Sequence, residues 1–215
     1  MVIVMSATAV LARGQQTRER ILEAAERAVL QKGFKSTSIE EIVVAAGITR
    51  NGFFYHFPDK HALAKALLVR YIAHDDALIG GLLDRADELV DDPLQAYLAF
   101  LKMFSEVMAD LPDRHPGCLV ASYCYQDQVF SREIRALSAE TMIRWRNHFR
   151  ARLDMIARHY APGLPVDLDA LADMVLVLVE GGIIMDKVHR GKGVLPRQLM
   201  LARTFIGLLF ERARA

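Results

Sequence analysis

Three polar residues, Thr49, Arg50 and Asn51, follow a glycine turn at the expected start of a short helix and have no evident packing role. A guanidinium group can pair with guanine or with a phosphate, and a carboxamide can read the edge of adenine. A helix fits the major groove of B-DNA, where its first residues reach the base edges. The chemistry open to these residues is therefore hydrogen bonding to a DNA duplex.

Other side chains around this helix could hold the same duplex in place. Tyr55 and His56 lie at its end, where phosphates would be, and Lys60 adds a positive charge to the start of the next helix, which already favours anions. Thr37, ahead of the preceding helix, could donate its hydroxyl to a phosphate on the other side. The predicted DNA contacts are Thr37, Thr49, Arg50, Asn51, Phe53, Tyr55, His56 and Lys60.

Some of these residues also have purely structural interpretations, which the sequence leaves open. Thr37 or Ser38 could serve only as a helix cap, and His56 could be a packing residue. We expect Phe54 and Phe57 in the core, whereas Phe53 could lie in the core or face the DNA.

The elements that must position these residues are helices, because the apolar spacing is helical almost throughout and no strand-like alternation stands out. Gly33 is expected to end a first helix over 15–32. Ser38 with Glu41, or Thr37 with Glu40, fits a capping box for the second helix. Further helices are predicted over 49–55, 60–89, from 93, and over 117–125, 131–160, 167–189 and 196–214.

The stretch from Gly33 to Leu63, GFKSTSIEEIVVAAGITRNGFFYHFPDKHAL, resembles the N-terminal domain of TetR/AcrR-family transcriptional regulators. It shares their glycine–aromatic end of helix 1, their Ala-Ala-Gly turn and their aromatic-rich helix that ends in H-F-x-x-K. It departs at Phe54, where many relatives carry tyrosine. The resemblance implies an all-α fold of about nine helices, with an N-terminal three-helix helix-turn-helix DNA-binding domain and a C-terminal helical ligand-binding and dimerisation domain. It also implies a homodimer that binds palindromic double-stranded operator DNA and responds to a small-molecule inducer.

We expect residues 1–14 to form a flexible arm, residues 15–60 the helix-turn-helix domain, and residues 61–215 the ligand-binding and dimerisation domain. In the resembled family the last two helices form the dimer interface. The helix over 167–189 is apolar nearly all round, as expected of a helix buried on both sides. The predicted interface residues are Val175, Val179, Ile183, Phe205, Ile206 and Leu209.

Aromatic and methionine side chains are dense in the middle of the chain, and such soft walls suit apolar or aromatic ligands. The predicted pocket residues are Phe104, Tyr123, Trp145 and Phe149, with His148 or Glu180 as a polar anchor. Each of these residues could instead belong to the ordinary core or to a satisfied buried pair.

The composition sets outer limits on the function. The 215 residues are 53% hydrophobic and 25% charged, which is typical of a globular protein, and the net charge is only +1. No phosphate loop, CxxC or HExxH spacing, GxSxG elbow or dinucleotide fingerprint is present, so we expect neither an enzyme nor a metal or cofactor. No run is long enough to span a bilayer, so we expect no membrane partner and a cytoplasmic protein.

Three questions remain open at this level. Cys118, in a Gly-Cys-Leu step, could be a redox-sensing thiol, although a small buried residue is the plainer interpretation. The alternative from another functional class is a helical ligand-binding protein whose N-terminal domain, the head, does not read DNA. The resemblance favours a repressor, and an activator is the alternative that the sequence leaves open.

Overall fold

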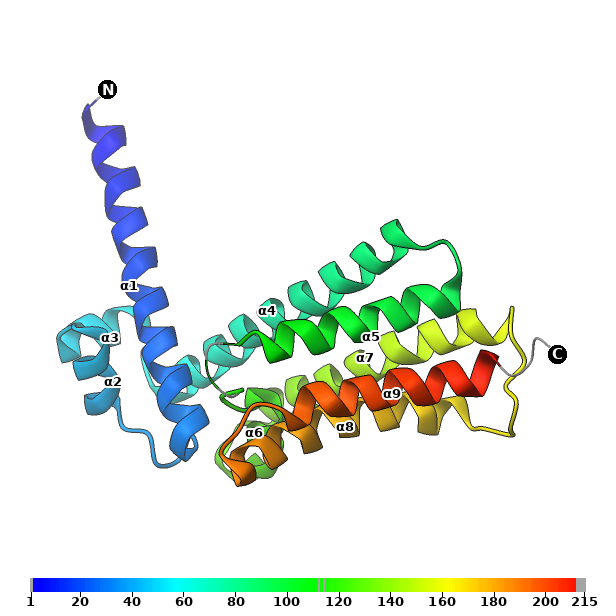
Figure 1. The fold of residues 1–215 in the computed structure, drawn as a ribbon. Helices are drawn as coiled ribbons and strands as arrows, with labels where there is room; N and C mark the ends of the chain where they lie inside the picture. Colours follow the sequence, from blue (N-terminus) through cyan, green and yellow to red (C-terminus); the bar gives the residue numbers. More distant parts are fainter. Residues whose placement is uncertain (1, 112, 114, 212–215) are drawn as a thin grey trace. The chain divides into compact units, whose positions relative to one another are not determined.

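The computed structural model describes residues 2–111, 113 and 115–211, which form helices joined by loops, with no strand among them. The nine α-helices and one 3-10 helix of this part are α1 (Val2–Lys32), α2 (Ile39–Ala46), α3 (Arg50–His56), α4 (Lys60–Leu89), α5 (Pro93–Ala109), α6 (Leu119–Tyr125), η1 (Asp127–Val129), α7 (Arg132–Ala157), α8 (Leu168–His189) and α9 (Val194–Glu211). Figure 1 follows the chain through them. The all-α class is confirmed, and the predicted bounds of α4 agree with those observed.

Polar caps set the starts of the helices that the sequence delimits well. Ser38 caps α2 by accepting the backbone N–H of Glu41 at 3.1 Å, which decides the capping register in favour of Ser38. Gly47 ends the helix with φ 62, a left-handed conformation that glycine adopts without a steric penalty. Asp92 caps α5 ahead of Pro93, so this helix begins at the predicted residue.

The N-terminal segment differs from the prediction. We expected a flexible arm over 1–14, but α1 is helical from Val2, and of this arm only Met1 lies outside the described residues. Gly14 is the only strong helix breaker before Gly33, and one internal glycine costs a helix only about 1 kcal/mol. The helix therefore continues through it. The predicted end of α9 at Arg214 also lies outside the described residues.

The chain divides into two compact units, and the division differs from the boundary predicted after residue 60. The first unit comprises the chain up to Tyr71 together with Leu119–Ser138, and the second comprises Ile72–Cys118 and the chain from Ala139 onward. The helices α4 and α7 each contribute residues to both units.

An aromatic cluster explains why the segment around α6 belongs to the first unit. The ring of Phe34 lies 5.9 Å from that of Tyr123 and 5.0 Å from that of Phe130, and the last two rings stack at 4.1 Å. The Tyr123 hydroxyl donates a hydrogen bond to the Ala64 carbonyl at 3.2 Å. These contacts join residues far apart in the sequence, so apolar periodicity could not predict them.

Within the second unit, α9 packs along α5 and along α8 (Figure 1). The Asp186 carboxylate of α8 accepts the backbone N–H groups of Val194 and Leu195, at 2.7 and 3.1 Å, and so caps α9. A Cβ atom on Gly182 would lie 2.8 Å from the Leu195 Cα, so glycine is required for this close approach. Asp186 is thus a buried helix cap, and His189 is exposed.

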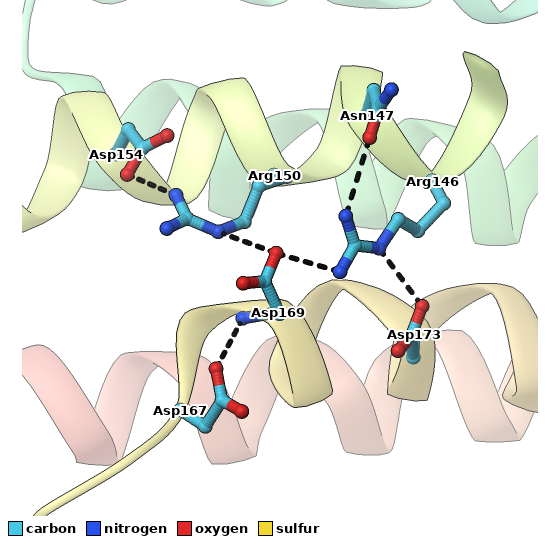
Figure 2. Close-up of polar contacts among 7 residues, drawn as sticks. All are labelled: Arg146, Asn147, Arg150, Asp154, Asp167, Asp169 and Asp173. Carbon is cyan, nitrogen blue, oxygen red and sulfur yellow. Dashed lines mark hydrogen bonds and ion pairs between the residues drawn. The ribbon is translucent and has the colours of Figure 1, made fainter. Parts of the chain in front are cut away.

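A network of ion pairs joins α7 to the start of α8 (Figure 2). Arg146 contacts Asp169 at 2.6 Å and Asp173 at 3.0 Å, and Arg150 pairs with Asp154 and, at 3.2 Å, with Asp169. The two guanidinium groups share the Asp169 carboxylate, and hydrogen bonds to carboxylates raise the pKa of both arginines. The network therefore links the start of α8 to α7.

Candidate nucleic-acid interface

The α3 helix has one buried face and one exposed polar face. Phe53 is fully buried and Phe57 is 2% exposed, one helical turn apart, so this edge anchors the helix. Thr49 caps its start by accepting the Gly52 N–H at 3.1 Å. On the other side, Tyr55 is 84% exposed. The α3 helix is thus a short rigid rod whose inner face is anchored in the core and whose outer face is exposed.

The three polar residues that the sequence singled out all lie on the exposed side of this rod. Thr49, Arg50 and Asn51 are exposed. Arg50 is ion-paired with Glu40 of α2, and its guanidinium lies 5.6 Å from the centre of the Phe54 ring. Since the guanidinium is already close to a carboxylate, a phosphate or a guanine would have to compete with Glu40 for it.

Phe53 and Phe54 exchange the roles that the sequence favoured. We included Phe53 among the DNA contacts and placed Phe54 in the core, but Phe53 is fully buried and Phe54 is 39% exposed. The physical reason is helical geometry: Phe53 shares a face with Phe57 four residues later, whereas Phe54 is rotated by about 100°. The ring available to DNA is therefore that of Phe54, and the prediction for Phe53 needs this correction.

Thr37 is also corrected by the structure. It is 1% exposed, and its hydroxyl donates to the Gly33 carbonyl at 3.0 Å. The hydroxyl therefore ties together the α1–α2 turn, and the phosphate contact that we predicted for it does not fit this burial.

Lys60 is half-buried and already engaged. Its ammonium group donates to the Phe34 carbonyl at 2.7 Å and lies 4.5 Å from the centre of the Phe34 ring. Burial lowers the pKa of the Lys60 ammonium. Lys60 therefore connects the start of α4 to the α1–α2 turn. A phosphate could bind its ammonium group only in addition to these contacts.

His56 is half-buried at the end of α3. Burial first, and then the charge of Arg18, lower the pKa of its imidazole below the ordinary value of 6.5. Arg18 itself lies over the Phe57 ring at 5.2 Å. His56 is therefore neutral at pH 7 and could offer a phosphate only a neutral N–H donor.

One exposed residue near this surface was not predicted. Val44 of α2 is 80% exposed, although a valine inside an apolar run is usually assigned to a core. Its position two residues from the buried Ile42 and Ala46 places it on the opposite face of α2, and that spacing could have revealed it. An exposed methyl-bearing side chain beside a DNA-reading helix can pack against thymine methyl groups.

The predicted pocket residues are all buried but do not form one cluster. Phe104 and Phe149 both contact the Phe100 ring, with centroids 5.8 and 6.2 Å away. Trp145, one turn before Phe149, donates its indole N–H to Asp76 at 2.7 Å. Tyr123 belongs to the first unit, with its hydroxyl on Ala64.

The two predicted polar anchors behave differently. His148 is exposed. Burial raises the pKa of the Glu180 carboxyl, and a hydrogen bond with Cys118 partly opposes that shift. Cys118 is 9% exposed, so the thiol proposed as a redox sensor is buried against this carboxyl.

Most of the predicted dimer residues are buried within the chain itself, which corrects that part of the prediction. Val175, Ile183, Ile206 and Leu209 are at most 5% exposed, because the packing of α9 on α5 and α8 covers them. Val179 is half-buried, and only Phe205, at 44%, is exposed. The apolar residues that α8 and α9 do expose are Val177, Ile184, Met185, Val188, Met200, Leu201, Phe205 and Leu208.

Two further features are absent from the described residues. No helix in this part of the chain is both long and apolar enough to cross a membrane. Nor does this part bring three or more histidine, cysteine, aspartate or glutamate side chains together where they could hold a metal ion.

Comparison with known proteins agrees with this geometry. The family model described as "Bacterial regulatory proteins, tetR family" matches residues 21–67. The regulator TtgR of Pseudomonas putida is 38% identical over 114 residues, which are 51% of this chain and 51% of TtgR. The chain thus spans about half the length of that relative. The repressor DhaR of a Mycobacterium species is 22% identical over 200 residues and 90% of each chain.

Solved structures extend the likeness to nearly the whole chain. The regulatory protein TetR from Rhodobacter sphaeroides has a TM-score of 0.69 at 25% identity and covers 89% of this chain and 97% of its own. A TetR-family regulator from Agrobacterium tumefaciens has a TM-score of 0.74 at 22% identity, covering 92% and 99%, and shows a shared fold.

An N-terminal helix-turn-helix followed by a helical body defines a class of bacterial regulators rather than a class of enzymes. Within that class, residues 21–67 of this chain match the model of the TetR family.

Proposed function

We propose that the chain is a transcriptional repressor that binds a palindromic operator as a homodimer and is released by a small apolar or aromatic ligand. The observation that carries the proposal is the outer face of α3, where Thr49, Arg50, Asn51 and Tyr55 are exposed on a helix anchored by Phe53. A DNA-reading helix needs this combination, because base contacts must be free while the rod that bears them stays rigid.

A twofold pair of chains would supply the second half of the binding site. The apolar side chains that α8 and α9 expose form the surface that we assign to the dimer, in place of the residues first predicted. The heads of the two chains could then bind half-sites about 34 Å apart, which is one helical turn of DNA. Such a regulator would act in the cytoplasm, where the chromosome lies.

The switch would use the helices common to both units. The helix α4 runs from Lys60, beside the head, into the second unit, so a ligand that favours one position of α4 would alter the spacing of the two heads. Only a difference in ligand affinity between the two states can drive such a change. Release as the outcome, rather than activation, is supported by the names of two relatives, the repressors DhaR and BepR.

The test is selection of duplexes from a random DNA pool by the full-length protein, followed by measurement of affinity for the selected duplex. We expect a palindromic sequence, an affinity that falls with salt, and losses of roughly ten- to hundredfold for Arg50→Ala and Asn51→Ala. Ile143→Ala, at an exposed position of α7, is the matched control and should bind normally.

The same experiment distinguishes the alternatives. If no duplex is preferred at moderate salt, the chain is a ligand-binding protein whose head does not read DNA. If the selected complex survives every small molecule but dissociates on oxidation, and Cys118→Ser removes that response, the chain is a thiol-based regulator.

A further inference from the structure

Tyr97 and Tyr123 are the most deeply buried tyrosines of the described residues, and their hydroxyls differ in hydrogen bonding. The Tyr123 hydroxyl donates to Ala64 at 3.2 Å. Tyr97 of α5 is 1% exposed, and its hydroxyl has no hydrogen-bond partner among the described residues. A buried hydroxyl left unpaired costs about 1–3 kcal/mol, so such a group calls for a physical explanation.

The orphaned hydroxyl differs from the other unpaired buried atoms of the described part. These are two nitrogens of Arg150, and that guanidinium is ion-paired with Asp154 and Asp169. Tyr97 is neutral, because burial raises the pKa of its hydroxyl, so it keeps a proton to donate. No ion pair therefore compensates Tyr97.

Tyr97 belongs to a group of aromatic rings that meet at Phe100. Tyr97 stacks with Phe100 at a centroid distance of 5.7 Å, Phe100 stacks with Phe104 at 5.8 Å, and Phe149 of α7 closes the group at 6.2 Å from Phe100. Each such contact contributes only about 0.5–1.5 kcal/mol. A flat ligand that separates these rings can replace their contacts with its own.

A charge that acts on Tyr97 shows which kind of ligand atom would be favoured. The guanidinium of Arg152 acts on Tyr97 by lowering the pKa of its hydroxyl, against the larger effect of burial. Arg152 is mostly buried and is held by Asp87 at 2.7 Å. A hydroxyl that donates, beside a positive charge, matches an oxygen that accepts.

We propose that Tyr97 is the polar anchor of the ligand site, with Phe100, Phe104 and Phe149 as its walls, and that the ligand is an aromatic molecule bearing an acceptor oxygen such as a carbonyl. The proposal rests on the ligand response in the proposed function and specifies its chemistry. It also assigns the role of anchor to a residue other than His148 and Glu180, the two that the sequence suggested.

The test compares two probes that differ in one carbonyl oxygen, acetophenone and ethylbenzene. Each is titrated by NMR into the full-length protein without DNA, for the wild type, Tyr97→Phe and Tyr123→Phe. We expect the wild type to bind acetophenone more tightly. We expect Tyr97→Phe to reduce the ratio of the two dissociation constants about 3- to 10-fold, the range of one neutral hydrogen bond, and Tyr123→Phe to leave it unchanged.

A stability measurement on the same variants separates an anchor from a structural hydroxyl. Removing an unpaired buried hydroxyl should leave the urea midpoint of Tyr97→Phe equal to or above that of the wild type, whereas Tyr123→Phe, which loses a hydrogen bond, should unfold at lower urea. An unchanged probe ratio in Tyr97→Phe, a midpoint that falls as in Tyr123→Phe, or no binding of either probe to the wild type would overturn the proposal.

The outcome is independent of the DNA-binding proposal, because no duplex is present. If the probe ratio changes as expected but duplex selection fails, the ligand site stands and the repressor function does not. If duplex selection succeeds but the probe ratio does not change, the chain is a regulator whose ligand is anchored elsewhere.

Discussion

The helix-turn-helix and the α8–α9 pair are both rich in apolar residues, yet the sequence located the exposed polar residues of the first and misplaced most of the exposed residues of the second. In the head, α2 and α3 are short, and each buries a narrow edge, such as Phe53 with Phe57. In α8, apolar residues surround the helix, so the pattern offers no contrast between a face turned to its own chain and one turned outward. Periodicity is informative only where polar residues delimit the apolar stripe.

The largest effect that would test this comparison lies within α3. Phe53→Ala should lower the free energy of unfolding by about 3–5 kcal/mol, because it empties a fully buried aromatic site. Phe54→Ala, one residue on and 39% exposed, should cost far less stability and should weaken mainly the binding of the selected duplex. Urea denaturation together with duplex titration measures both effects. Similar stability losses in the two variants would contradict the assignment of the faces.

The second effect concerns the exposed faces of α8 and α9. Val188→Asp together with Phe205→Glu should weaken dimerisation at least about a hundredfold, since charges buried in an apolar interface lack partners. Analytical ultracentrifugation across a concentration series measures this. Ile143→Asp, an equally exposed apolar position on α7, is the control and should remain dimeric. A double variant that dimerises normally would show that this surface is not the interface.

A third effect is a pH dependence of the stability of the second unit, which contains His115. Burial first, and then the charge of Lys187, lower the pKa of His115 from 6.5 to about 4, and its Nδ1 accepts the Gly117 N–H at 3.2 Å. The unfolded chain therefore takes up this proton at higher pH than the folded chain, so the stability contributed by His115 is complete above pH 6.5 and is lost as the pH falls towards 4. The loss should be about 1–3 kcal/mol.

Fluorescence of Trp145, which lies in the same unit as His115, reports this transition, since the chain has one tryptophan. Unfolding of the wild type and of His115→Gln between pH 7 and 4 should diverge over this window, and the comparison cancels the groups that the two proteins share. Parallel pH profiles would mean that His115 does not carry the effect.

The smallest effect returns to the head. Glu40→Gln removes the carboxylate that pairs with Arg50, and should tighten duplex binding about 2- to 5-fold, in keeping with an exposed pair worth under about 1 kcal/mol. Glu41→Gln is the matched control, because it removes the same charge from the same helix but from a pair with Lys32. An equal gain in both variants would mean that bulk charge, and not the freeing of Arg50, governs affinity.

Local sequence was sufficient for most of the helices, for narrowing the cap of α2 to Thr37 or Ser38, and for the exposed trio that begins with Thr49. These features depend on residues within one or two turns of each other, where spacing and side-chain type decide the energetics. The family likeness followed from the same short range.

Tertiary structure alone decided which apolar faces are covered, that the segment around Tyr123 packs with the head, and that Tyr97 is buried without a partner. Each of these depends on atoms brought together from distant parts of the chain: Phe34 on Tyr123, α9 on α8, and Phe149 near the rings of α5. A sequence pattern records that a residue is apolar or can donate a hydrogen bond. Whether that surface or that donor finds a partner depends on the packing of the whole unit.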